Sequence, residues 1–140
     1  MQLLFDRRIK RTLFGLWCLA WLFTAVLLLA PLSSPIRVSY ADLIAHFLVF
    51  ACLAFGTVGF SHRGSELTLL ATATIAGGVA LEIAQGLVPY RTFDILDMAA
   101  NTLGAMVGYA GGLSVLLLVI RPAAEARAKG AEEAPTMTSR

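Results

Sequence analysis

The chain has 140 residues, enough for one domain, of which 58% are hydrophobic and only 14% are charged, and its mean hydropathy is +0.77. Soluble proteins carry about 25% charged residues, and here the charges gather in short clusters between long apolar runs. This pattern excludes an ordinary soluble domain and indicates an integral membrane protein. The net charge of +2 does not indicate nucleic-acid binding, because the basic residues fall beside the apolar runs.

The first two apolar runs are predicted to be membrane spans. Residues 12–31 carry no charge and follow a short basic segment. A secretory signal peptide would have an apolar region of about 7–15 residues and a small-residue cleavage site. This run is longer and ends in Ala30 and Pro31, so we expect an uncleaved span. Residues 32–41 are predicted to be a loop, and the second span, residues 43–60, contains one histidine, His46.

A polar turn at residues 61–66 precedes the third predicted span, residues 67–88, and a short loop precedes the fourth, residues 94–120. At about 1.5 Å per residue, each of the four runs can cross roughly 30 Å of hydrocarbon. The fourth is longer than needed, so its first two turns would lie along the membrane surface or re-enter the bundle. We therefore predict an all-α, four-helix transmembrane bundle in residues 1–120. Residues 121–140 are predicted to form a mostly disordered tail.

Lysine and arginine predict the orientation of this bundle. Nine of them lie in the segment before the first span, in the 61–66 turn or in the tail. The two opposite loops hold only Arg37 and Arg91. Because basic residues are retained on the cytoplasmic side, both termini are predicted to be cytoplasmic. The loops at residues 31–42 and 89–92 would then face outward.

Polar side chains occupy the outer ends of the second, third and fourth predicted spans. Within each span they are three, four or seven residues apart, which places them on one helix face. With the loop arginine beside them, they form a predicted polar pocket: Asp42, His46, Glu82, Gln85, Arg91, Asp94, Asp97 and Asn101. An acidic side chain at mid-membrane costs about 2.5–3.5 kcal/mol, and less near the interface. We therefore expect these groups to be paired, hydrated or lining an outward-facing cavity.

Small residues predict where the helices approach each other closely. The fourth span carries glycines every four residues on the face of its polar stripe, and the third span has one glycine four residues before Glu82. The predicted packing glycines are Gly78, Gly104, Gly108 and Gly112. Because glycine lets helix backbones approach closely, we expect the third and fourth spans to pack against each other.

Two sequence blocks carry a family resemblance. The first consists of Asp42, His46, Phe47 and Phe50. The second and more specific block consists of Glu82, Gln85, Pro89, Arg91, Phe93, Asp94, Asp97, Asn101, Gly104 and Gly108. Together they cover about residues 40–109 and resemble the VanZ-like family of bacterial membrane proteins, named for a protein linked to teicoplanin resistance. The resemblance implies a multi-pass protein of the bacterial cytoplasmic membrane and cell envelope. Family members commonly have lysine after the first aspartate, where this chain has Leu43.

Three functions fit the predicted pocket. As a binding protein, it would hold or protect against an amphipathic envelope ligand, such as a lipid-linked precursor or a glycopeptide-type antibiotic, with Arg91 on a phosphate or carboxylate. As a membrane-embedded enzyme acting on an envelope lipid, it would use Glu82, Asp97 and His46 as acid, base or metal-binding groups. As a structural or assembly subunit, it would use the polar groups only to hold its helices together. We favour binding over catalysis.

The sequence contains no nucleotide-binding loop, no cofactor fingerprint and no nucleophile constellation, and it has no tight HxxxH or ExxH element. We therefore expect neither a cofactor nor a metal. The expected partners are the lipid bilayer, an amphipathic small molecule and a second copy of the chain, and no nucleic acid.

Overall fold

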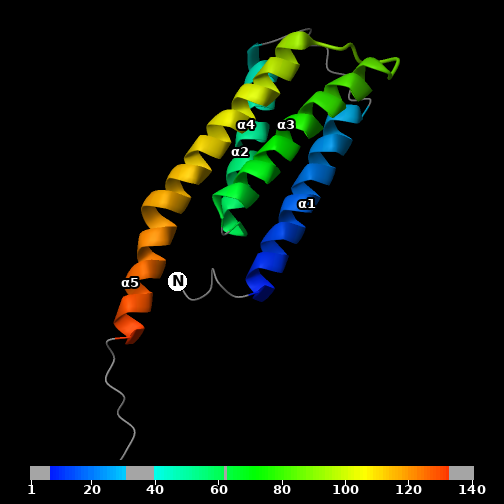
Figure 1. Ribbon diagram of the computed structural model, residues 1–140. Coiled ribbons are helices and arrows are strands. Elements are labelled where there is room, and N and C mark those ends of the chain that lie inside the picture. Colours follow the sequence, from blue (N-terminus) through cyan, green and yellow to red (C-terminus); the bar gives the residue numbers. More distant parts are fainter. Residues whose placement is uncertain (1–6, 31–39, 62, 133–140) are drawn as a thin grey trace, which may run out of the picture.

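The computed structural model describes residues 7–30, 40–61 and 63–132, which form a bundle of long helices (Figure 1). In chain order the elements are α1 (Arg7–Leu29), α2 (Tyr40–Gly56), the 3-10 turn η2 (Thr57–Gly59), α3 (Gly64–Gly86), α4 (Ile95–Val115), the π-helical turn η3 (Leu116–Ile120) and α5 (Arg121–Glu132). These ranges contain no strand. The predicted all-α, four-helix membrane fold is confirmed.

Within the described residues, four helical stretches are long and apolar enough to cross a membrane: Arg7–Leu29, Tyr40–Gly59, Gly64–Gly86 and Ile95–Gly130. Large apolar side chains cover the outside of each, with exposed fractions of 68% at Phe23, 70% at Leu69 and 75% at Leu118. Water does not tolerate apolar surface on this scale, whereas lipid does. The chain is therefore a multi-pass membrane protein.

The boundaries of the second and fourth helices depart from the sequence-based ones. α2 begins at Tyr40, so the end of the predicted loop is helical. α4 begins at Ile95 and runs unbroken to Val115, and Asp94 caps it by accepting a 2.8 Å hydrogen bond from the Leu96 N–H. Its first two turns thus continue directly into the rest of the helix. Residues 1–6, 31–39, 62 and 133–140, including Arg37, lie outside the described residues.

The chain after Ile120 also differs from expectation. The sequence predicts a mostly disordered tail from residue 121, whereas α5 continues the line of α4 beyond the bundle (Figure 1). Alanine, arginine, lysine and glutamate dominate α5 and are strong helix formers. The π-helical turn η3 lies just before Pro122, whose ring nitrogen cannot donate a helical hydrogen bond. The wider turn accommodates this missing bond at the junction.

Glycines allow the closest approach in the bundle, which is between α2 and α4. A Cβ atom at Gly104 would overlap the backbone carbonyl of Phe47, and one at Gly108 would overlap that of Ala51. α3 and α4 pack against each other as expected, but Gly104 and Gly108, which were expected to meet α3, meet α2 instead. The reason is that glycine spacing marks a face for close approach without specifying which helix approaches it.

The other two packing glycines behave differently from this pair. Gly78 on α3 faces both neighbours, since its Cβ would lie 2.7 Å from the Phe50 ring and 3.2 Å from Asn101 Cβ. The nearest atoms to a Cβ at Gly112 would be 3.7 Å away, which is an ordinary van der Waals contact. Close packing therefore depends on the glycines near the polar side chains and not on Gly112.

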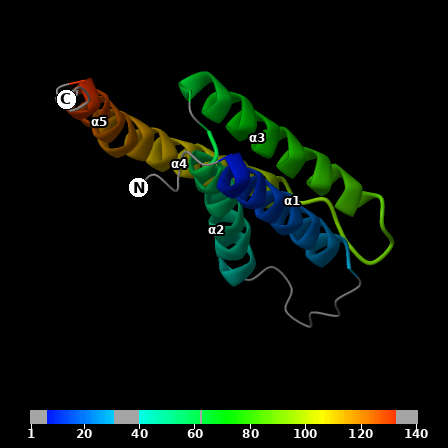
Figure 2. The same ribbon diagram turned by 90° about the horizontal axis from the view of Figure 1, so that it is seen from below.

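α1 packs on α2 and α3 (Figure 2) and contributes the fewest buried residues of the four long helices, with only Thr24 buried. Two tryptophans attach it. The Trp17 Nε1–H donates a 2.8 Å hydrogen bond to the Leu53 carbonyl, and the Trp21 ring meets Phe50 edge-on at 5.7 Å between centroids. Phe50 belongs to the buried core with Ala54 and Ala105.

These tryptophans provide a matched pair of substitutions. Trp17→Phe removes the hydrogen bond to Leu53. It should therefore lower the free energy of unfolding by about 1 kcal/mol more than the loss of ring contacts alone. Trp21 is the control, because its buried Nε1 has no hydrogen-bond partner in the described residues. Trp21→Phe should therefore lose only packing. Thermal unfolding in detergent measures the difference, and equal losses of stability in the two variants would contradict the expectation.

Candidate functional site

Polar side chains meet at one end of the bundle, where α1 and α3 finish and α2 and α4 begin (Figure 1). We call this the polar end. The polar cluster there consists of Asp42 and His46 on α2, Glu82 on α3, Asp94 at the cap of α4, and Asp97 and Asn101 on α4. His46, Glu82 and Asn101 are buried, with exposed fractions of 4%, 1% and 1%. Three helices thus contribute to one cluster.

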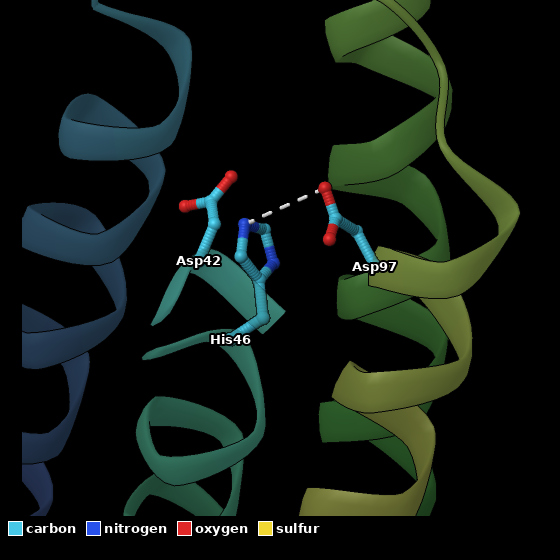
Figure 3. Close-up of side chains that lie close together, drawn as sticks. All are labelled: Asp42, His46 and Asp97. Atoms are coloured by element: carbon cyan, nitrogen blue, oxygen red, sulfur yellow. Dashed lines mark ion pairs between the residues drawn. The ribbon is translucent and has the colours of Figure 1, made fainter. Parts of the chain in front are cut away.

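His46 connects α2 with α4 through both of its ring nitrogens. Its Nδ1 lies 3.0 Å from Asn101 Oδ1, and its Nε2 lies 3.9 Å from Asp97 Oδ2 (Figure 3). A carbonyl oxygen can only accept a hydrogen bond, so with Asn101 Oδ1 facing the ring, Nδ1 carries the proton that is donated. This bond fixes the imidazole so that Nε2 points toward the carboxylate of Asp97.

Glu82 connects α3 with the start of α4. Its Oε1 accepts a 2.7 Å hydrogen bond from the Asp94 backbone N–H, while the Asp94 side chain caps the helix. Its Oε2 is buried and has no hydrogen-bond partner within the described part of the chain. The Glu82 carboxylate also interacts electrostatically with Asp97 and His46. The charge on the Glu82 carboxylate therefore influences the charges on His46 and Asp97.

Asp42 completes a smaller group around the imidazole. In Figure 3 the carboxylates of Asp42 and Asp97 lie on two sides of the His46 ring. One potential ligand atom from each of these three residues lies within 4.8 Å of the others. Asp42 is exposed and Asp97 is partly exposed, so the group opens toward the polar end. The metal-binding residues considered from the sequence are His46, Glu82 and Asp97, whereas in the structure Asp42 takes the place of Glu82 in the group with His46 and Asp97.

Two residues of the predicted pocket, Gln85 and Arg91, form no hydrogen bond or ion pair with the polar cluster in the part of the chain that the structure describes. Gln85 turns toward α1, where its Nε2 donates a 3.0 Å hydrogen bond to the Leu28 carbonyl. Arg91 is partly exposed in the connection between α3 and α4 and acts electrostatically on Asp97. Among the described residues, no carboxylate lies within ion-pair distance of its guanidinium.

Tyr90 is a residue at the polar end that sequence reasoning missed. Its hydroxyl donates a 2.9 Å hydrogen bond to the Leu29 carbonyl. Together with Gln85 it satisfies two carbonyls at the last turn of α1, which a helix leaves without intrahelical partners. The available signal was a tyrosine beside Pro89 in a loop next to a membrane span, a common interfacial position.

The chain matches the VanZ/LLP1 family over residues 2–119, a range that contains the whole polar cluster. The chain belongs to the VanZ/LLP1 family. The resemblance inferred from the two sequence blocks is therefore confirmed. An uncharacterized protein of Schizosaccharomyces pombe is 31% identical over 100 residues, which cover 69% of this chain and 59% of that protein. The chain thus spans less than two thirds of this relative's length. No solved structure matches it.

Proposed function

We propose that this family member binds the anionic headgroup of an amphipathic envelope ligand at its polar end. One observation carries the proposal: side chains from three helices form a buried polar cluster, and Arg91 stands beside it without an ion-pair partner among the described residues. A structural role alone would favour complete internal pairing. Here the buried Oε2 of Glu82 and the Nδ2 of Asn101 lack hydrogen-bond partners in the part of the chain described.

The position of the cluster supports a headgroup rather than an acyl chain as the bound moiety. His46 lies six residues into α2 from Tyr40, a depth of about 9 Å along the helix. This is near the level of lipid headgroups when the helix spans the bilayer. Arg91, in the connection above, can bind a phosphate or carboxylate through two parallel hydrogen bonds. Amide and carboxylate groups of the cluster can accept or donate hydrogen bonds to sugar or peptide groups.

We further propose that the polar end faces outward from a bacterial cytoplasmic membrane and that both termini are inside. The distribution of lysine and arginine supports this orientation. A lipid-linked envelope precursor or a glycopeptide-type antibiotic carries an anionic group and would meet the protein on that side. Binding of such a ligand would either deliver it to a partner or withhold it from its target.

Arg91→Ala is the sharpest test of this proposal. In lipid nanodiscs, binding of a fluorescent polyprenyl phosphate should weaken about 10- to 100-fold, as expected when a charge-assisted pair worth about 1.5–3 kcal/mol is lost. Arg63→Ala is the matched control, because Arg63 is an exposed arginine at the opposite end of α3. The control should bind as tightly as the wild type.

The ligand class is tested with the same nanodiscs. A neutral polyprenol should bind weakly to both wild type and Arg91→Ala, because it has no anionic group. Equal binding of polyprenyl phosphate to wild type and Arg91→Ala would count against headgroup recognition. If all variants remain stable and bind none of the anionic probes, including a glycopeptide antibiotic, the assembly function is the better explanation of the polar cluster.

A further inference from the structure

Asp42, His46 and Asp97 form a group with the composition of a cation site, on two helices that glycines hold close together. We propose that these three residues bind a divalent transition-metal ion, with Zn²⁺ and Co²⁺ as suitable probes. The site lies within the polar cluster of the proposed headgroup pocket, but metal binding by these three residues does not require Arg91. It also differs from the expectation of no metal, which was drawn from the absence of an HxxxH or ExxH element in the sequence.

The distances suit coordination after small side-chain rotations. Bonds of about 2.0–2.2 Å from zinc to nitrogen or oxygen place neighbouring ligand atoms roughly 3–4 Å apart. His46 Nε2 and Asp97 Oδ2 are 3.9 Å apart, and ligand atoms of all three residues lie within 4.8 Å of one another. The His46 ring is held in place by Asn101, whereas the Asp42 side chain is exposed and can turn toward the ion.

Asn101 holds His46 in the orientation that a metal-binding histidine needs. A metal-binding histidine usually donates its second ring N–H to a carbonyl or carboxylate, and this bond selects the tautomer. His46 Nδ1 lies 3.0 Å from Asn101 Oδ1. The lone pair of Nε2 is then free, and Nε2 is the nitrogen that faces Asp97. Asn101 thus serves as a positioning residue in α4 for a ligand in α2.

The carboxylates of the polar cluster also favour a bound cation. The polar cluster contains four carboxylates, and Arg91 is the arginine that acts on Asp97. Of these carboxylates, Glu82 is 1% exposed, with an unpartnered Oε2, and it interacts electrostatically with His46 and Asp97. An uncompensated carboxylate is costly to bury. A divalent ion beside His46 would add two positive charges to the cluster that contains this carboxylate.

The ligand atoms indicate which ions suit the site. Mg²⁺ and Ca²⁺ prefer sets of oxygen atoms, whereas imidazole nitrogen with carboxylate oxygen suits zinc and its first-row neighbours. Three protein ligands leave a fourth position of a tetrahedral ion open. Because Asp42 and Asp97 are accessible from the polar end, a water molecule or a ligand oxygen can reach that position.

The test uses the full-length protein, purified in detergent and stripped with a chelator. Titration with Co²⁺ should give visible absorption bands that saturate at about one ion per chain, and Zn²⁺ should abolish them. Asp42→Asn alters an exposed ligand, so folding should be retained, and affinity should fall at least about tenfold. Asn101→Leu should weaken binding about 10- to 100-fold while retaining the ligands themselves.

Glu66→Gln is the matched control, since Glu66 is also an exposed acid in the first turn of a helix but lies at the opposite end. It should bind Co²⁺ like the wild type. The proposal is overturned if the wild type shows no saturable Co²⁺ spectrum, or if Asp42→Asn and Glu66→Gln bind Co²⁺ equally. If Asn101→Leu fails to fold, the wild-type and Asp42→Asn titrations still decide the question. The Co²⁺ titration needs no headgroup ligand, so its failure is distinguishable from a failure of the Arg91 test.

Discussion

Replacing Gly108 with alanine is expected to destabilise the bundle by about 3 kcal/mol. The added Cβ would overlap the backbone carbonyl of Ala51 on α2. A side chain could rotate away from such a contact, but a helix backbone cannot, so α2 and α4 would have to separate. Overpacking in a close-packed core costs about 1–3 kcal/mol, and a clash with rigid backbone belongs at the upper end of that range.

Gly15→Ala is the control for this substitution. It adds the same methyl group in the middle of α1, where no atom lies within 4 Å of the new Cβ. Because alanine favours helix over glycine by roughly 0.5–1 kcal/mol, the control should be neutral or slightly stabilised. Chemical or thermal unfolding in detergent measures both variants. Similar stability of Gly108→Ala and Gly15→Ala would contradict the packing described between α2 and α4.

Glu82→Ala is expected to cost about 2–3 kcal/mol. It removes the acceptor of the 2.7 Å hydrogen bond from the Asp94 N–H, which links the end of α3 to the cap of α4. Hydrogen bonds to charged groups contribute about 1.5–3 kcal/mol, and the partner left behind is partly buried. Glu82→Gln retains an oxygen acceptor in the same position, so it should lose only about 1 kcal/mol.

Glu66→Ala provides the comparison for Glu82→Ala, since it removes an exposed glutamate from the same helix. Glu66 lies in the first turn of α3, where an acidic side chain contributes about 0.3–1 kcal/mol, so Glu66→Ala should cost less than Glu82→Ala. Thermal unfolding of the three glutamate variants in one detergent gives the relevant differences. A Glu82→Ala protein as stable as Glu66→Ala would mean that the link between α3 and α4 contributes little.

The order of stability among the Glu82 variants also separates the two uses of this side chain. If the hydrogen bond to Asp94 dominates, glutamine retains most of the stability. If the negative charge matters more, because it balances Arg91, His46 or a bound cation, glutamine and alanine should be similarly destabilised. The metal titration distinguishes a cation from the protein's own positive groups.

The four membrane helices could be predicted from the sequence by itself. Length and hydropathy are local properties, and a run of about 20 apolar residues must form its own backbone hydrogen bonds in lipid. Helical periodicity also placed Asp42 with His46, and Asp97 with Asn101, on single faces, because residues three and four apart are neighbours on any helix. The polar end was therefore visible in outline from the spacing within each helix.

Only the tertiary structure decided which faces meet. Gly104 and Gly108 mark a face for close approach, yet any of three helices could have approached it, and the one that does is α2.

Gln85 shares a helix with Glu82 but turns to Leu28 of α1. Asp94 is a cap and not a member of the helical stripe. Periodicity determines the direction of a side chain within its own helix, whereas its neighbour depends on the rotation and crossing of separate helices. That is why the grouping of Asp42, His46 and Asp97 required the fold.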